Sequence, residues 1–147
     1  MKGLVIGDSF LDIYCSGLVE RISPEAPIPI LNKTKKKYVA GGAANVACNL
    51  ASLGIETTLL TICGKDKEAE NLENLLNKKE IDTHIIQSTN SPTITKTRFL
   101  SGGQQLLRTD NEITFSNSES KELFCLTKKL IKSFDYLIYS DYDKGTL

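Results

Sequence analysis

A pair of glycines that runs directly into a helix-forming segment is the feature that most constrains how this chain folds. Residues 39–54 read Val-Ala-Gly-Gly-Ala-Ala-Asn-Val-Ala-Cys-Asn-Leu-Ala-Ser-Leu-Gly. Gly41 and Gly42 have no Cβ, so the backbone can turn sharply there and a ligand can approach it closely. Taken alone, the same run also suits a tight turn packed under a sheet, and the surrounding chain decides between the two interpretations.

The residues after the glycine pair have the spacing of a helix that ends near Gly54. Apolar residues recur three and four positions apart, and alanines four apart allow close packing against a neighbour. The first N–H groups of a helix point out of its start together with the positive end of its dipole, so ligand oxygens are attracted to Gly41, Gly42 and Ala43. Asn45 adds an amide that both donates and accepts hydrogen bonds.

Length and composition exclude several classes of protein. The chain has 147 residues, enough for one ordinary domain. Its 18 Lys and Arg balance 18 Asp and Glu, which predicts neither a nucleic-acid partner nor an anionic membrane partner. The four cysteines lack the spacing of a metal site or a disulfide framework, which indicates free thiols in a reducing cytoplasm. No apolar run suits a signal peptide or a membrane span.

Short apolar strands alternate with amphipathic helices along most of the chain. This alternation predicts an α/β fold of parallel units with right-handed crossovers. The only histidine, His84, is expected to be a structural or surface residue, since it has no partner at catalytic or ligand spacing. The expected strands are 4–6, 57–62, 81–86 and 136–139, and we expect the last of these to be buried. The expected helices are 43–53, 67–80 and a third helix that begins at a capping box in 116–119 and continues to 131.

Two extended segments interrupt the alternation. Prolines alternate with apolar residues in 20–38, which predicts an edge or lid strand. The segment 92–110 has the alternation of a hairpin with its turn at 101–103. We expect both to form a small β layer, with lid strands at approximately 14–38 and 92–110. The basic run Lys33, Lys35, Lys36 and Lys37 is expected to be a solvated turn between strands.

Polar residues follow several of the expected strands. In open parallel sheets, ligands bind beyond the carboxyl ends of the strands, which makes Asp8 and Asp12 candidates for binding hydroxyl groups. Asp141 also lies at a strand end. The alternative for Asp8 is a cap on the following turn. We expect Asp8, Asp12, Asn45 and Asp141 to converge beneath the β layer, in a site that excludes water from a small molecule.

The expected hairpin carries a basic face. Lys96 and Arg98 share one face by the period of two, and Arg108 lies on the returning strand. These three side chains suit a phosphate group, to which charged donors bind strongly. A solvated face is the alternative.

The chain resembles the N-terminal half of a ribokinase-like sugar kinase of the pfkB family. The run Gly-Gly-Ala-Ala-Asn-Val-Ala at 41–47, followed by Gly54 and Gly64, keeps the spacing of the first signature of that family. Within the family, further segments are similar to the heptose-7-phosphate kinases, which make a precursor of ADP-heptose for lipopolysaccharide cores. These segments are Gly7-Asp8 with Leu11-Asp12, 21–27, 92–96, 104–108, and 140–142 followed by Lys144-Gly145.

The resemblance implies a Rossmann-like parallel sheet flanked by helices, with a small β lid, truncated here to the N-terminal half of one kinase domain. It also implies transfer of the ATP γ-phosphoryl group, with Mg²⁺ in the complete enzyme, to the anomeric hydroxyl of a sugar 7-phosphate. Asp12, Gly41, Gly42 and Asn45 would bind sugar hydroxyls, with Asp8 as a further candidate. A phosphorylated monosaccharide is the expected ligand, and a homodimer through the β lid is the expected assembly.

The sequence departs from the family where catalysis is concentrated. The second family signature, Gly-Ala-Gly-Asp, supplies the catalytic base, and no segment of these 147 residues matches it. We therefore expect no catalytic residue, no tight ATP binding and no kinase activity in this chain alone. Two alternatives remain. The first is a non-enzymatic sugar-phosphate-binding or dimerisation module, whose lid edges pair readily. The second is a kinase for another sugar such as ribose or fructose, which the basic lid residues disfavour.

Overall fold

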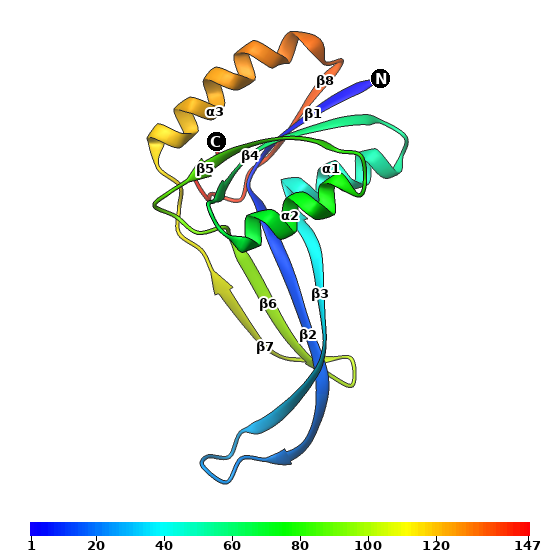
Figure 1. Ribbon diagram of the computed structural model, residues 1–147, viewed down its shortest axis with the longest axis vertical. Helices are drawn as coiled ribbons and strands as arrows, with labels where there is room; N and C mark the ends of the chain where they lie inside the picture. The colour runs from blue at the N-terminus through cyan, green and yellow to red at the C-terminus, as the bar shows by residue number, and fades with distance from the viewer.

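Two four-stranded sheets make up the fold of the computed structural model, which describes residues 1–33 and 35–147 (Figure 1). The first sheet has the strand order β5-β4-β1-β8 and the second β3-β2-β6-β7. The strands are β1 (Lys2–Gly7), β2 (Ser9–Ile22), β3 (Pro29–Gly42), β4 (Glu56–Gly64), β5 (Asp82–Ser88), β6 (Thr95–Ser101), β7 (Gln104–Asn111) and β8 (Tyr136–Ser140). The helices are α1 (Ala43–Ser52), α2 (Lys67–Asn77), α3 (Asn117–Leu130) and the short 3₁₀ helix η1 (Ile131–Ser133).

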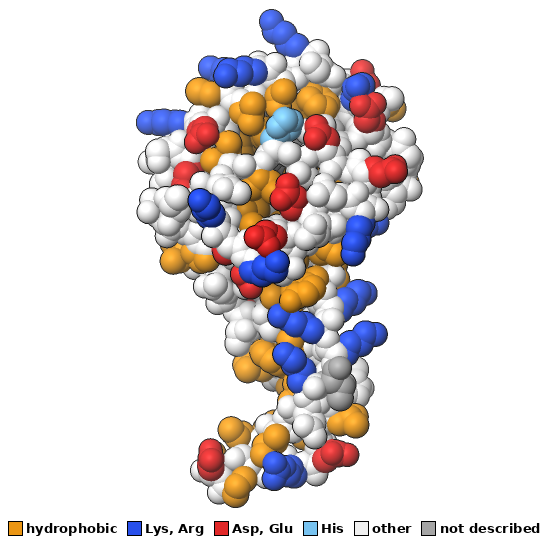
Figure 2. Space-filling view, viewed as in Figure 1, with side chains coloured by type: hydrophobic (Ala, Val, Ile, Leu, Met, Phe, Trp, Pro, Cys, Tyr) orange, Lys and Arg blue, Asp and Glu red, His pale blue; other side chains and the backbone are white. Residues whose placement is uncertain are grey.

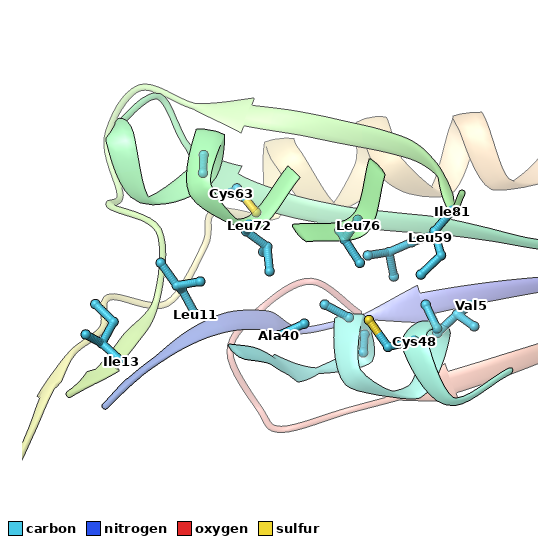
Figure 3. Packing of buried hydrophobic residues seen from close by; sticks show 14 of the residues in the cluster. Val5, Leu11, Ile13, Ala40, Cys48, Leu59, Cys63, Leu72, Leu76 and Ile81 are labelled. Atoms are coloured by element: carbon cyan, nitrogen blue, oxygen red, sulfur yellow. The ribbon is translucent and has the colours of Figure 1, made fainter. Parts of the chain in front are cut away.

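The first sheet is entirely parallel and carries helices on both faces, as the alternation of strands and helices predicts. Side chains of β1 alternate between two apolar clusters, Val5 in one and Leu4 and Ile6 in the other. The first cluster includes residues of α1 and α2, and the second includes Leu123 of α3. Figure 3 shows Leu72 of α2 in the first of these clusters, which forms one of the two halves of the core.

The second sheet projects away from the body that carries the helices, and the β2–β3 hairpin reaches farthest (Figure 1). Strand β2 pairs antiparallel with β3 and parallel with β6, and β6 pairs antiparallel with β7. The predicted β layer is therefore present, built from the two segments that interrupt the alternation. Pro29 opens the edge strand β3, where a missing N–H donor is tolerated.

Only Asp8 separates β1 from β2, so the two sheets meet at the carboxyl end of β1. Helix α1 begins at this junction, directly after β3. It ends as predicted: Gly54 has a φ of 79°, its N–H donates to Ala51 O at 3.0 Å, and the Ile55 N–H donates to Leu50 O at 3.2 Å. The glycine-led helix start is thereby held between the two sheets.

Two local predictions are wrong. The basic run from Lys33 to Lys37 lies within edge strand β3, not in a turn, because the prolines place the turn at 23–28. Figure 2 shows Lys and Arg side chains along this projecting part of the molecule. Strand β8 is half-buried with Tyr139 61% exposed, not fully buried, because it lies at the edge of the first sheet.

The four cysteines are free, as predicted, with Cys125 exposed and the other three buried. Burial raises the pKa of the Cys63 thiol to about 12, so this thiol is protonated at neutral pH. In the described part of the chain, no helix has both the length and the apolar character needed to cross a membrane.

Candidate functional site

A pocket of about 440 Å³ lies where the two sheets meet. This volume falls within the range of about 300–1,000 Å³ that is common for small-molecule sites. Strand β2, the β3–α1 junction, strand β6 and the segment after β8 all contribute side chains. The lining residues are Phe10, Asp12, Tyr14, Val39, Ala40, Gly41, Gly42, Asn45, Lys96, Arg98 and Tyr142.

Asp12 and Arg98 form an ion pair inside this pocket. Arg98 Nη1 donates to Asp12 Oδ1 at 2.5 Å, and both side chains are mostly buried. The hydrogen bond to Asp12 raises the pKa of the Arg98 guanidinium, although burial opposes this effect. The guanidinium also lies 5.2 Å from the centre of the Tyr14 ring. The pocket therefore holds one charged acceptor and one charged donor whose remaining hydrogen-bonding capacity suits sugar hydroxyl groups or a phosphate.

The glycine pair is required by close packing at the junction. A Cβ on Gly41 would lie 2.4 Å from Phe10 Cδ2 and 2.7 Å from Asp12 Oδ2. Gly42 has a φ of 58°, and a Cβ there would lie 2.2 Å from the backbone oxygen of Asp8. The N–H of Ala43 donates to that same oxygen at 2.9 Å, so this predicted ligand donor is used within the fold.

The structure brings together six of the predicted site residues in the one pocket. Asn45, exposed in the first turn of α1, lies on the same pocket as Asp12 of β2. The six residues are Asp12, Gly41, Gly42, Asn45, Lys96 and Arg98.

Aromatic residues of the pocket were missed by sequence reasoning. Phe10 and Tyr14 flank Asp12 on the same face of β2, and Tyr142 packs edge-on against Phe10 with 5.2 Å between ring centres. The alternation of Phe10, Asp12 and Tyr14 was the available signal, since residues two apart share a face of a strand. Such rings supply apolar surface beside a sugar.

Lys96 lies on the pocket wall beside two carboxylates. Its Nζ is 3.0 Å from Asp110 Oδ2 and 3.2 Å from Glu112 Oε2, and it lies 5.4 Å from the centre of the Phe10 ring. The hydrogen bond from Lys96 lowers the pKa of Asp110. Lys96 is therefore held by intramolecular anions at the edge of the pocket.

Three predicted site residues lie outside the pocket lining. The carboxylate of Asp8 is fully buried and accepts three backbone N–H groups of the segment after β8. Arg108 is paired directly across the ladder with Arg98, but its Nε lies 2.9 Å from Asp110 and its side chain is half exposed. Asp141 is exposed and accepts the N–H of Asp143 at 2.8 Å. The convergence expected for Asp8 and Asp141 beneath the lid is thus not observed.

Two larger cavities have different chemistry. One of about 650 Å³ lies beside edge strand β5 and is lined by the carboxylates of Asp66, Glu70 and Glu73 as well as by Lys65 and Lys67. Another of about 490 Å³ is lined largely by apolar side chains, including Phe115, Leu123 and Phe124. We take the pocket at the junction as the candidate site because its carboxylate, amide and two cations lie beside the glycine pair at the start of α1.

Comparison with known proteins places this geometry in a family. The model of the pfkB family carbohydrate kinases matches residues 1–144. The chain belongs to the pfkB family of carbohydrate kinases. The parallel sheet with its flanking helices agrees with this membership.

Individual relatives agree with membership of the pfkB family. The chain is 46% identical over 146 residues to Bifunctional protein HldE of Haemophilus influenzae and 45% identical over 144 residues to that of Coxiella burnetii. The match to the Haemophilus protein covers 99% of this chain but only 31% of that protein, which is less than a third of its length.

Solved structures share the fold. A putative phosphofructokinase from Staphylococcus aureus superposes with a TM-score of 0.73 at 17% identity, over 100% of this chain and 45% of that one. A carbohydrate kinase from Agrobacterium tumefaciens gives a TM-score of 0.69 at 21% identity, over 94% and 44%. These likenesses show a ribokinase-like fold, and this chain covers less than half of the length of either structure.

Membership of a kinase family implies the use of ATP, usually with a divalent metal ion. Within residues 1–33 and 35–147, no three His, Cys, Asp or Glu side chains are grouped so that they could hold a metal ion. We assign no metal or nucleotide contact to this chain.

Proposed function

We propose that this chain is the sugar-binding part of a D-glycero-β-D-manno-heptose 7-phosphate kinase. Such an enzyme transfers a phosphoryl group from ATP to the anomeric hydroxyl in the formation of ADP-heptose for the lipopolysaccharide core. The observation that carries the proposal is the convergence of Asp12, Asn45, Lys96 and Arg98 on one pocket at the glycine-led helix start. The 46% identity to Bifunctional protein HldE and the motifs shared with heptose-7-phosphate kinases support the choice of sugar.

In this proposal the residues divide by chemistry. Asp12 accepts hydrogen bonds from sugar hydroxyls, and Asn45 both donates and accepts. Gly41 and Gly42 line the pocket and present backbone groups to the ligand, and their missing Cβ atoms leave room for Phe10 to pack against the start of α1. Lys96 and Arg98 bind the 7-phosphate through charge-assisted hydrogen bonds.

Phosphoryl transfer needs groups that hold the transferring phosphoryl and take the proton of the attacking hydroxyl. The family signature that supplies them, Gly-Ala-Gly-Asp, has no counterpart in these 147 residues. We therefore propose that these residues bind and orient the sugar phosphate, and that turnover needs a polypeptide that carries this signature.

The test is an ADP-release assay with heptose 7-phosphate and ATP, run on this chain with and without a polypeptide that supplies the rest of a kinase fold. We expect ADP formation that depends on the sugar phosphate only in the reconstituted sample. Phosphorus NMR of the product should show a second phosphate on the anomeric carbon. Absence of ADP formation in a reconstituted sample that binds ATP would contradict the proposal, as would equal rates with unphosphorylated heptose.

A non-catalytic association module is the second candidate, and one observation favours it. Leu18, Ile22 and Ile28, on or beside the projecting β2–β3 hairpin, are each more than half exposed. Apolar side chains grouped on a projecting sheet are typical of an interaction surface. Sugar-independent self-association without any binding of heptose 7-phosphate would favour this candidate over the kinase.

A further inference from the structure

Glu112, one residue beyond the end of β7, joins two lysines from distant parts of the chain. Lys144 Nζ donates to Glu112 Oε1 at 2.8 Å, and Lys96 Nζ donates to Glu112 Oε2 at 3.2 Å. Lys96 belongs to β6, whereas Lys144 belongs to the segment that follows β8. One carboxylate therefore bridges two ammonium groups, with one group on each of its oxygens, and Lys96 Nζ lies in addition 3.0 Å from Asp110 Oδ2.

The three side chains lie at the surface and are each partly covered by the fold. The side chains of Lys96 and Lys144 are 16% and 24% exposed, and that of Glu112 is 31% exposed. The hydrogen bond from Lys144, followed by that from Lys96, lowers the pKa of Glu112. The hydrogen bond to Glu112 raises the pKa of Lys144. The two ion pairs share one carboxylate and thus form a network, which stabilises more than a single surface ion pair does.

The bridge stands at the edge of the candidate pocket. Lys96 lines the pocket itself, and so does Tyr142, two residues before Lys144. The N–H groups of Tyr142 and Lys144 donate to the buried Asp8 carboxylate at 2.8 and 3.1 Å. The Lys144 carbonyl in turn accepts the N–H of Phe115 at 2.9 Å. The backbone of Lys144 is therefore fixed, and Asp8 acts as a positioning residue for it.

The ammonium groups of Lys96 and Lys144 converge and form a site for an anion that offers a separate oxygen to each of them. A carboxylate offers two oxygens and a single charge, whereas a phosphate monoester offers three oxygens and a charge of about −1.5 to −2. A phosphate would therefore satisfy both lysines better than Glu112 does. Exchange of one anion for the other breaks and forms only ion pairs, so it needs no change in the fold.

We propose that Glu112 is an internal competitor that occupies the phosphate position of Lys96 and Lys144 until a phosphorylated sugar displaces it. The inference rests on the proposed function, because it adds Lys144 to Lys96 and Arg98 as a residue that binds the sugar's phosphate and names Glu112 as a residue that opposes binding. An unphosphorylated sugar carries no anion to displace Glu112, so the lysines contribute nothing to its affinity. The arrangement selects for phosphorylated ligands.

The test is calorimetric titration of the chain with heptose 7-phosphate, unphosphorylated heptose and inorganic phosphate. Glu112→Gln keeps the shape of the side chain but removes the competing charge, so we expect about threefold to tenfold tighter binding of both phosphate-bearing ligands. Lys144→Met removes one charged donor, so we expect binding of both to weaken about tenfold or more. Affinity for unphosphorylated heptose should change less than about twofold in either variant.

Matched controls come from the ion pair of Lys2 and Glu56, 2.7 Å apart on the first sheet. Glu56→Gln and Lys2→Met change the net charge equally and should leave phosphate binding unchanged. If Glu112→Gln weakens phosphate binding, as Lys144→Met is expected to do, the proposal is overturned, because Glu112 would then only position the lysines. An unchanged affinity in Glu112→Gln would overturn it equally. If wild-type chain fails to bind heptose 7-phosphate but Glu112→Gln gains affinity for inorganic phosphate, the competitor holds and the proposed function falls.

Discussion

Asp8 shows how a single buried carboxylate fixes a segment that borders the candidate site. It accepts the N–H groups of Tyr142, Lys144 and Thr146 at 2.8, 3.1 and 3.1 Å and is 0% exposed. Asp8→Asn removes the charge and turns an NH₂ group toward donors, so the free energy of unfolding should fall by about 3 kcal/mol. Urea denaturation measures this. Asp141→Asn, which affects one exposed hydrogen bond, should cost less than about 0.5 kcal/mol, and equal losses would contradict the assigned role of Asp8.

Substitution of two glycines with positive φ, Gly54 and Gly42, distinguishes the cost of backbone strain from the cost of a steric clash. Gly54 has a φ of 79° with open space around it, so Gly54→Ala should cost about 1–2 kcal/mol from the left-handed conformation alone. Gly42 has a φ of 58° and, in addition, the backbone oxygen of Asp8 would lie 2.2 Å from an added Cβ, so Gly42→Ala should cost at least about 2 kcal/mol more. Thermal unfolding of the two variants compares the costs. Similar costs would show that the junction relaxes to admit a methyl group.

Asp66 gives a pH dependence whose direction follows from its contacts. Burial opposes ionisation, but hydrogen bonds from the hydroxyl and N–H of Thr93 and from the Ala69 N–H outweigh it and lower the pKa of Asp66. A carboxylate whose pKa is lower in the folded state stabilises the fold above its unfolded pKa of about 3.9. This contribution is lost as the pH falls below about 4. Urea midpoints between pH 6 and 2.5 should therefore fall less steeply in Asp66→Asn than in wild type, whereas parallel curves would contradict the assignment.

At the residue scale, sequence reasoning located polar groups better than it located their partners. The glycine pair, Asp12 and Asn45 are recognisable because a helix start and a strand end occupy fixed places in an α/β fold. Asp8 is chemically similar to Asp12, but its carboxylate binds backbone groups more than 130 residues away, at Tyr142 and Lys144. No local pattern encodes such a contact, and the same holds for the bridge between Lys144 and Glu112.

At the scale of elements, the β2–β3 hairpin is the structure that projects farthest from the core (Figure 1). Figure 2 shows hydrophobic side chains near its tip, and Leu18 on β2 is 56% exposed. We propose that the homodimer expected through the β lid uses this hairpin. Leu18→Asp should then weaken the dimer about tenfold or more, because a charge is costly in an apolar interface. Sedimentation equilibrium measures the dissociation constant. Leu53→Asp, exposed at the end of α1, is the control, and an equal effect of both variants would exclude the hairpin as the interface.

Elements with a strong period were predicted correctly, and those that depend on their place in a sheet were not. The helices α1, α2 and α3 and the parallel strands follow from apolar spacing and capping residues. The lysines of β3 suggested a turn because a solvated edge strand and a turn share the same polarity. The exposure of β8 depends on which strand lies next to it, and this is a property of the sheet order that a strand's own residues do not carry.

At the scale of the whole molecule, the candidate pocket forms where the parallel sheet and the second sheet meet, and the two sheets contribute different features to it. The parallel sheet carries the core and fixes the start of α1, while the second sheet supplies Asp12, Lys96 and Arg98. The β lid was predictable as two extended segments, but its angle to the body and the resulting pocket follow from contacts across the junction. Lys96, Arg98 and Arg108 of the second sheet are paired with carboxylates, so the proposed binding of a phosphate there would exchange one anionic partner for another.

The most direct test of the central claim is calorimetric titration of the chain with heptose 7-phosphate and with unphosphorylated heptose, in wild type and in Lys96→Met. We predict that the phosphorylated sugar binds wild type more tightly and loses about tenfold or more of its affinity in Lys96→Met, while the unphosphorylated sugar is almost unaffected. Lys67→Met, on the exposed side of α2, should change neither affinity. Equal losses for the two sugars in Lys96→Met would contradict a phosphate-binding role for this pocket.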